Sequence, residues 1–244
     1  MNTKVIVSLT SHTKERLKNV PYFLYHSIFK HCYDYVKVVL TLWKDDIPLM
    51  PDELKMMIDN GLVELIEAEQ DLKCNLKYFY CMKKYRDLPI ITIDDDSVYP
   101  KQMIPDLLLA AEKYPNVIIG RSGVLVDKNK SYIHCKLVNY GVDKISSWSD
   151  LSDKFFDNMN LEGYGGIFYP ANILDITDDL IPELKEFYRA DDIYLYILER
   201  RKNIKRIVPK YDYNKLDVCT KGFDAISTKS DNVKMIDDLI KRWC

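Results

Sequence analysis

The sequence has little of several features that would place it in common protein classes. It contains only six cysteines in 244 residues, and they are scattered without a Cys-x-x-Cys pair. This pattern excludes a disulfide scaffold and predicts reduced thiols in a cytosolic protein. No run approaches the ~18 to 20 apolar residues that a membrane-spanning helix needs, and the segment after Met1 is too short and too polar for a secretory signal. We therefore expect a cytoplasmic protein with no transmembrane segment.

Neither sign of charge dominates. Lysine and arginine number 35 against 37 aspartates and glutamates, so the formal net charge is −2. This balance gives no electrostatic reason to expect nucleic acid as a partner, and an anionic ligand would have to be bound by local groups. With 47% hydrophobic and 30% charged residues, the chain can bury a real core and is not expected to be disordered.

Strand-like and helix-like segments alternate through the first half of the chain. The expected strands cover residues 4–9, 36–43, 62–66, 88–93 and 116–120. The expected helices begin near Asn19 and cover residues 51–59, 76–85 and 102–113, while residues 10–18 form a polar loop. Such alternation is typical of an α/β fold with a mostly parallel sheet flanked by helices. In such sheets, ligands bind beyond the carboxyl ends of the strands.

The second half is less regular. It predicts a hairpin within residues 124–140, helices over residues 150–157 and 191–200, and a helix at the carboxyl terminus. The terminal helix has an apolar stripe formed by Val233, Ile236, Leu239, Ile240 and Trp243. Because a stripe at helical spacing is the ordinary mark of packing, we expect it to cover the protein's own core. The neighbouring Lys241 and Arg242 would also suit a helix lying on a membrane surface.

Three consecutive carboxylates, Asp94, Asp95 and Asp96, end the apolar run of residues 88–93. Two unit charges ~4 Å apart repel by about 4 kcal/mol at the effective dielectric of a protein surface, and a cation would reverse that cost. On an extended backbone Asp94 and Asp96 share one face while Asp95 points the other way. Oxygen ligands partly open to water suit Mg²⁺ or Mn²⁺ carried in by a phosphorylated substrate. The alternative is a solvated acidic turn.

Two other segments could bind a nucleotide. The loop after the first strand gathers hydroxyl, imidazole and guanidinium groups from Ser8, Thr10, Ser11, His12 and Arg16. Such a loop can hold a nucleotide base and its phosphates, although hydroxyls also cap helices and turns. Lys77 lies one helix before the acidic triplet, where it could neutralise a diphosphate or be an ordinary surface lysine.

Two motifs in the second half could contact a substrate. Residues 163–166, Gly-Tyr-Gly-Gly, contain three of the eight glycines of the chain, a density that favours a ligand-facing loop over a plain turn. Asp191 and Asp192 open a predicted helix. They could simply complement the helix dipole, or one of them could be a general base at the cleft.

The order of these motifs resembles that of the nucleotide-sugar-dependent glycosyltransferases of the GT-A fold. It is most similar to small bacterial enzymes that build capsule, O-antigen or other surface polysaccharides. The resemblance covers roughly residues 4–208 and rests on the order of five motifs more than on any one of them. It implies a GT-A-like catalytic domain over residues 1–210, with a nucleotide-binding half (1–120) and an acceptor-side half (121–210). Residues 211–244 would then form a carboxyl-terminal tail.

The resemblance also implies roles for individual residues. Asp94 would lie near the ribose and the metal, Asp96 would be the principal ligand of Mn²⁺ or Mg²⁺, and Asp95 would support them. The nucleotide and diphosphate would be bound by Thr10, Ser11, Arg16 and Lys77. Gly165 and Gly166 would flank the donor sugar and the acceptor. Asp192, with Asp191 beside it, would be the catalytic base of an inverting transfer.

The implied partners are a nucleotide-sugar donor, with UDP as the first expectation, and a glycan or lipid-linked glycan acceptor. Peripheral association with the inner membrane face would suit such an acceptor. The sequence departs from the family's pattern at the metal site. Many relatives supply a histidine near the carboxyl terminus as a metal ligand, whereas the last histidine here is His134. Asn214, Asp217 or water would have to complete the coordination.

Two other functions stay open. A nucleotidyltransferase that makes nucleotide-sugars would share the strand and helix alternation and the acidic ligands. Such enzymes commonly carry a glycine-rich basic loop after the first strand, and residues 10–18 contain no glycine. A non-catalytic nucleotide- or carbohydrate-binding module would use the triplet as a calcium site or a solvated turn.

Overall fold

A central seven-stranded sheet organises the chain in the computed structural model, which describes residues 3–31, 33–139, 154–209 and 230–243. The strand order is β10-β5-β9-β4-β1-β2-β3. The strands are β1 (Val5–Thr10), β2 (Val36–Trp43), β3 (Val63–Ala68), β4 (Ile90–Thr92), β5 (Ile118–Gly120), β9 (Ile167–Tyr169) and β10 (Arg206–Ile207). All neighbouring pairs are parallel except those made by β9, which runs antiparallel to β4 and β5. The predicted α/β fold with a mostly parallel sheet is confirmed.

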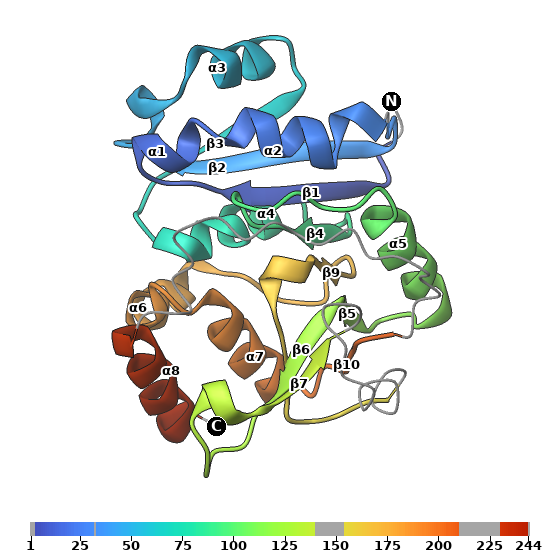
Figure 1. Cartoon of the computed structure of the whole chain (residues 1–244), viewed down its shortest axis with the longest axis vertical. Coiled ribbons are helices and arrows are strands. Elements are labelled where there is room, and N and C mark those ends of the chain that lie inside the picture. Colours follow the sequence, from blue (N-terminus) through green and yellow to red (C-terminus); the bar gives the residue numbers. More distant parts are fainter. Residues whose placement is uncertain (1–2, 32, 140–153, 210–229, 244) are drawn as a thin grey trace.

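Helices cover both faces of this sheet (Figure 1). They are α1 (Lys14–Leu17), α2 (Val20–Ser27), α3 (Asp52–Asp59), α4 (Phe79–Lys84), α5 (Met103–Lys113), α6 (Ile181–Leu184), α7 (Asp191–Arg201) and α8 (Ser230–Trp243). Alternate residues of β1 belong to different cores, because successive side chains of a strand point to opposite faces. Val5 and Val7 belong to the core that α1, α2, α3 and α5 share, whereas Ile6 belongs to the core that α4, α6, α7 and α8 share.

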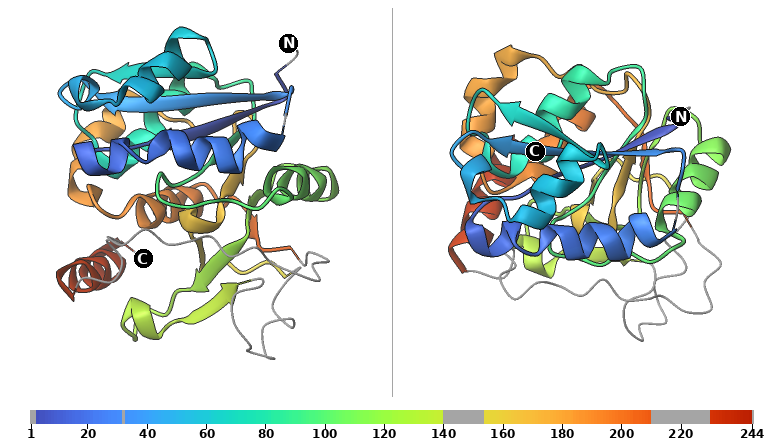
Figure 2. Two further views of the ribbon diagram at one scale, coloured as in Figure 1. Left: turned by 45° about the horizontal axis from the view of Figure 1, so that its top comes forward. Right: turned by 90° about the horizontal axis from the view of Figure 1, so that it is seen from above.

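A second, three-stranded sheet lies beside the first one (Figures 1 and 2). Its antiparallel strands are β6 (Ser122–Leu125), β7 (Lys136–Asn139) and β8 (Met159–Leu161), in the order β7-β6-β8. The hairpin expected within residues 124–140 is present as β6 and β7. Seven short 3₁₀ helices complete the described structure: Phe29–His31, Ile47–Leu49, Lys73–Lys77, Tyr132–His134, Gly163–Gly165, Asp178–Leu180 and Lys185–Phe187.

Three local predictions differ from the structure. The expected loop over residues 10–18 contains α1, whose first turn is capped by the Thr13 hydroxyl accepting a bond from the Arg16 amide. The expected helix over residues 76–85 is split at Tyr78 into a 3₁₀ helix and α4. Residues 154–157 of the expected helix over 150–157 are not helical, and residues 150–153 lie outside the described residues.

Strand β9 matters for the site because it runs antiparallel to β4 and therefore begins at the edge of the sheet where β1 and β4 end. Thr92, the last residue of β4, pairs with Ile167, the first residue of β9. The glycine-rich turn before β9 therefore lies at the same edge as the acidic triplet after β4. A parallel strand would have placed that turn at the opposite edge of the sheet.

Candidate active site

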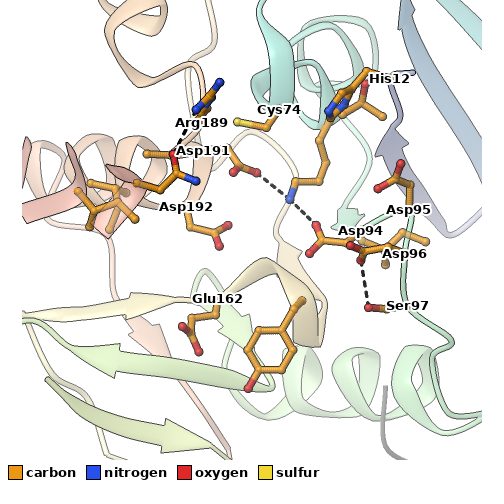
Figure 3. Close-up of a pocket in the computed structure, with 18 of the residues that line it drawn as sticks. His12, Cys74, Asp94, Asp95, Asp96, Ser97, Glu162, Arg189, Asp191 and Asp192 are labelled. Atoms are coloured by element: carbon orange, nitrogen blue, oxygen red, sulfur yellow. Dashed lines mark hydrogen bonds and ion pairs between the residues drawn. The ribbon is translucent and has the colours of Figure 1, made fainter. Parts of the chain in front are cut away.

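A cavity of about 320 Å³ lies beyond the carboxyl ends of β1 and β4 (Figure 3). Its described lining comes from seven parts of the chain: Thr10, His12 and Arg16; Cys74 and Lys77; Ile93 to Ser97; Tyr132; Glu162 and Tyr164; Arg189 to Ile193; and Asn232 and Ile236 of α8. Polar residues at this edge of a wound sheet are typical of a ligand site.

All three acids of the triplet line the cavity, and the Asp95 carboxylate points in another direction than those of Asp94 and Asp96 (Figure 3). The side chains of Asp94 and Asp96 are 29% and 23% exposed, whereas that of Asp95 is 6% exposed. Asp95 accepts hydrogen bonds from the Ser11 hydroxyl at 2.5 Å and from Arg16 Nε at 3.0 Å. Arg16 also pairs with Asp96 through Nη2 at 3.1 Å. Asp95 thus fixes Arg16 and the first loop, and leaves its two neighbours to face a ligand.

The turn that carries the triplet is anchored on two elements. Ile93 donates its amide to the Ser8 carbonyl of β1 at 3.0 Å. The amide of Asp94 donates to the Tyr99 hydroxyl at 2.8 Å, and the amide of Tyr99 donates to the Ser27 hydroxyl of α2 at 2.9 Å. Tyr99 is 1% exposed, so these bonds are shielded from water. The carboxylates therefore extend from a firmly held backbone.

Lys77 joins the triplet to the acidic start of α7. Its Nζ lies 2.7 Å from Asp94 Oδ1 and 2.7 Å from Asp191 Oδ2, and its side chain is only 7% exposed. The Ser8 hydroxyl donates to its backbone carbonyl at 2.6 Å. Burial by itself lowers the pKa of an ammonium group, but the charges of Asp191 and Asp94 raise the pKa of Lys77 well above its usual value. Lys77 is therefore a buried cation shared by two carboxylates.

Asp192 points into the same cavity from the first turn of α7 (Figure 3). Its Oδ2 accepts the amide hydrogen of Gly163 at 2.9 Å, and its buried Oδ1 has no hydrogen-bond partner among the described residues. Burial and the charge of Asp191 raise the pKa of Asp192 well above its usual value, although Lys77 acts in the opposite direction. Asp192 consequently keeps its proton at pH values where a free aspartate is ionised.

The described lining is negatively charged overall. It contains the six carboxyl groups of Asp94 to Asp96, Glu162, Asp191 and Asp192, against three basic side chains, Arg16, Lys77 and Arg189. Burial and the charge of Arg16 lower the pKa of His12, so this imidazole is neutral at pH 7 and adds no positive charge. A diphosphate would add further negative charge to this cavity.

The residues present are compatible with a divalent cation that arrives with a phosphorylated ligand. Among the described residues no group of three or more histidines, cysteines and acids is arranged to hold a metal by itself. Asp94 uses Oδ1 for Lys77, while Asp96 uses Oδ2 for Arg16 and accepts a long hydrogen bond of 3.4 Å from the Ser97 hydroxyl at Oδ1, a contact that a cation could replace. Mg²⁺ and Mn²⁺ sites of this kind use one or two carboxylates together with phosphate oxygens and water.

The structure brings most of the predicted site residues together. Thr10, Arg16, Lys77, the acidic triplet, Asp191 and Asp192 all line the cavity. The Thr10 hydroxyl, however, donates to the Thr41 carbonyl of β2 at 2.7 Å, and Ser11 lies behind Asp95. The roles of these residues in binding and catalysis stay predictions.

Gly165 and Gly166 are not among the lining residues, and their substrate-binding role also stays a prediction. A Cβ on Gly165 would face Arg121 and Ser122, and one on Gly166 would face Met103. Asn214 and Asp217, considered as further metal ligands, lie outside the described residues.

Sequence reasoning missed several residues of the cavity. Gly163 belongs to the glycine-rich loop that the sequence predicts to face a ligand, but its contact with Asp192 has no signal in the sequence. Gly163 itself is not among the residues that line the cavity, which include Tyr132, Glu162, Arg189 and Asn232. Asn232 lies on α8 and accepts a hydrogen bond from Arg189 at 3.4 Å, so the carboxyl-terminal helix contributes to the site.

Comparisons with known proteins agree with the fold. No protein-family model and no curated protein matches the chain by sequence. Among solved structures it resembles the mannosyltransferase PcManGT from Pyrobaculum calidifontis in complex with GDP-Man and Mn²⁺, with a TM-score of 0.52 and 11% identity. The match covers 86% of this chain and 55% of that protein, so the chain spans about half the length of this neighbour.

Two further solved structures show weaker likeness. S. aureus TarS in complex with UDP has a TM-score of 0.49 and 12% identity, with 85% of this chain and 59% of that one covered. The 4-diphosphocytidyl-2C-methyl-D-erythritol synthase from Anaerococcus prevotii has a TM-score of 0.48 and 11% identity, with 99% and 97% covered. At these identities the comparisons concern the fold, and the function has to be argued from the site.

Proposed function

We propose that the chain is a GT-A-type glycosyltransferase that moves a sugar from a nucleoside diphosphate donor to a hydroxyl group of a glycan acceptor. The observation that carries this proposal is the meeting of two acidic groups in one cavity at the carboxyl edge of the sheet. The triplet after β4 and the pair Asp191 and Asp192 face that cavity, with Lys77 between them. The triplet is suited to the donor, and the pair Asp191 and Asp192 is suited to the acceptor.

Arg16, Lys77 and the triplet would hold the donor diphosphate. Mn²⁺ or Mg²⁺, bound by Asp94 and Asp96 together with the phosphates, would offset charge that develops on the departing nucleoside diphosphate. Lys77 would exchange one of its carboxylate partners for a phosphate oxygen. Arg16 is held by Asp95 and Asp96 and would present its remaining donors to the phosphates.

Asp192 would act on the acceptor. The acceptor hydroxyl oxygen attacks the anomeric carbon, the bond from that carbon to the phosphate oxygen breaks, and the hydroxyl proton passes to Asp192. The nucleoside diphosphate leaves with the electrons of the broken bond. Attack from the face opposite the leaving group inverts the anomeric carbon. Asp191, the neighbour of Asp192, stays paired with Lys77 and keeps its ammonium group at the reaction centre.

A thermal-shift panel would test the donor class. UDP-, GDP-, CMP- and dTDP-sugars are added with and without Mn²⁺, and we expect a metal-dependent rise in Tm with one base. A ligand at 100 times its Kd adds ~2.7 kcal/mol, which corresponds to roughly 5 to 10 °C for a chain of this size. If no nucleotide sugar raises Tm under any condition, the proposal fails.

Product analysis separates the competing functions. Sugar transfer releases a nucleoside diphosphate from a nucleotide sugar and leaves no pyrophosphate. A nucleotidyltransferase would instead release pyrophosphate from a nucleoside triphosphate and a sugar phosphate. A non-catalytic module would give the thermal shift with neither product.

A further inference from the structure

Gly163 occupies a position where the backbone does not need a glycine. Of the three glycines in residues 163–166, only Gly166 has a φ in the left-handed region, at +87°. Gly163 has no such angle, so an alanine could adopt its backbone conformation. The reason for glycine at this position has to lie in its surroundings.

Those surroundings are two groups of the active site. A Cβ on Gly163 would lie 2.9 Å from Lys77 Nζ and 3.0 Å from Asp192 Oδ1, both too close for ordinary contact. The amide of Gly163 donates to the other oxygen of Asp192 at 2.9 Å. Because Gly163 has no side chain, the ammonium group of Lys77 can lie next to the position that a Cβ would occupy.

We infer that Gly163 is a positioning residue that allows Lys77 to pair with Asp94 and Asp191 at the same time, and that fixes Asp192 through its amide. Both ion pairs of Lys77 measure 2.7 Å, so they allow little displacement of Nζ. A methyl group at residue 163 would push the ammonium group away and weaken at least one pair. The geometry stands by itself, whereas its consequence for catalysis rests on the proposed sugar transfer.

An alanine at this position should leave the fold intact. The two atoms that a Cβ would meet are the ends of side chains, and neither belongs to the backbone. Replacement of glycine by alanine also reduces the conformational freedom of the unfolded chain, which favours folding. Gly163→Ala therefore tests the position of Lys77 rather than the architecture.

A double-mutant cycle provides the test. Gly163→Ala, Lys77→Gln and the double variant are compared with the wild type by Tm, by Kd for the nucleoside diphosphate with Mn²⁺, and by kcat and KM. We expect Gly163→Ala to lower kcat by at least about tenfold, or ~1.4 kcal/mol, with a smaller change in KM. In the Lys77→Gln background the same substitution should lower kcat clearly less, because the ammonium group is gone and only the contact with Asp192 Oδ1 remains.

Gly61→Ala is a suitable control. Gly61 has a φ of +71°, and a Cβ added there would have no atom within 4 Å, so alanine strains the backbone without touching the site. This variant should lower Tm and keep the wild-type kcat, and its change in Tm should add to that of Lys77→Gln. Gly163→Ala should instead lower kcat, and its effects should depend on whether Lys77 is present.

The stability measurements keep the inference separate from the proposed function. If the wild type transfers no sugar, the proposed function fails, but the cycle in Tm still applies. Gly163→Ala should lower Tm when Lys77 is present, and lower it less or not at all in the Lys77→Gln background. Additive effects on Tm, or a Gly163→Ala variant with wild-type kcat in an active enzyme, would overturn the inference.

Discussion

Asp192 has two oxygens in unlike surroundings, and this difference governs what the residue can do. Oδ2 is fixed by the amide of Gly163, while Oδ1 is buried with no hydrogen-bond partner among the described residues. A buried carboxylate oxygen without a partner is costly, and a proton or a hydroxyl group of a ligand would relieve that cost. An acceptor hydroxyl that donates to Oδ1 would be in place to lose its proton there.

The protonation of Asp192 leads to a prediction for pH dependence. Burial and the charge of Asp191 raise the pKa of Asp192, so this carboxyl group keeps its proton at pH values where a free aspartate is ionised. A base must be ionised to accept a proton, and kcat should therefore rise with pH along a limb centred well above the ordinary aspartate pKa of about 3.9. Because Asp191 and Lys77 interact with this group, the limb reports the coupled groups together.

Asp192→Asn should remove this limb and lower kcat by about 10²- to 10⁴-fold. Donor affinity should remain that of the wild type, because the substitution keeps the shape of the side chain and leaves Asp94, Asp96 and Arg16 unchanged. Initial rates from pH 5 to 9 together with calorimetric donor Kd values would check both statements. A variant that turns over at the wild-type rate would show that Asp192 is not the base.

At the scale of secondary structure elements, the turn after β4 buries one of its three acids and leaves the other two partly exposed in the cavity. Asp95 packs against the first loop with its side chain 6% exposed, while Asp94 and Asp96 face the cavity. Burial and the charge of Asp94 raise the pKa of Asp96, which means that its negative charge is not favoured by the protein alone. Asp95 and Asp96 should therefore respond in opposite ways to the same substitution.

Asp95→Ala should lower stability by about 1 to 3 kcal/mol, because it removes charge-assisted hydrogen bonds to Ser11 and Arg16. Asp96→Ala should leave Tm near the wild-type value and abolish the Mn²⁺-dependent part of donor binding. Urea denaturation and donor titration with and without Mn²⁺ would compare the two variants directly. Metal-dependent donor binding that survives in Asp96→Ala would remove Asp96 from the metal site.

The same elements show how far the sequence could predict this molecule. The strands that carry the site follow from apolar runs, and the triplet stands out because three adjacent acids oppose strand formation. The antiparallel pairing of β9 has no comparable signal, because its three residues acquire their partners from β4 and β5, which are distant in sequence. For the same reason the contact of Gly163 with Asp192 could not be foreseen, although the glycine-rich loop itself could.

At the scale of the whole molecule, the carboxyl-terminal helix links the core to the cavity. Helix α8 packs beside α7 and the 3₁₀ helix Tyr132–His134, and the amide of Tyr132 donates to Asp237 at 2.7 Å (Figure 1). Leu239 and Ile240 are buried in the core shared with α4, α6 and α7. Nearer the start of the helix, Asn232 lines the cavity. In the described part of the chain no helix is long and apolar enough to cross a membrane.

This packing predicts that α8 unfolds together with the sheet. Leu239→Ala should cost about 2 to 5 kcal/mol, as expected for a buried leucine, and should lower Tm by several degrees in a single transition. Asp238→Ala, at the exposed neighbouring position, is the matched control and should leave Tm nearly unchanged. Circular dichroism and tryptophan fluorescence would follow the melt in a Trp43→Phe, Trp148→Phe background, where Trp243 on α8, 6.3 Å from the Phe187 ring, is the one tryptophan left and reports the helix itself. A fluorescence transition well below that of the circular dichroism signal would mean that α8 is a separate unit and that the site keeps its shape without it.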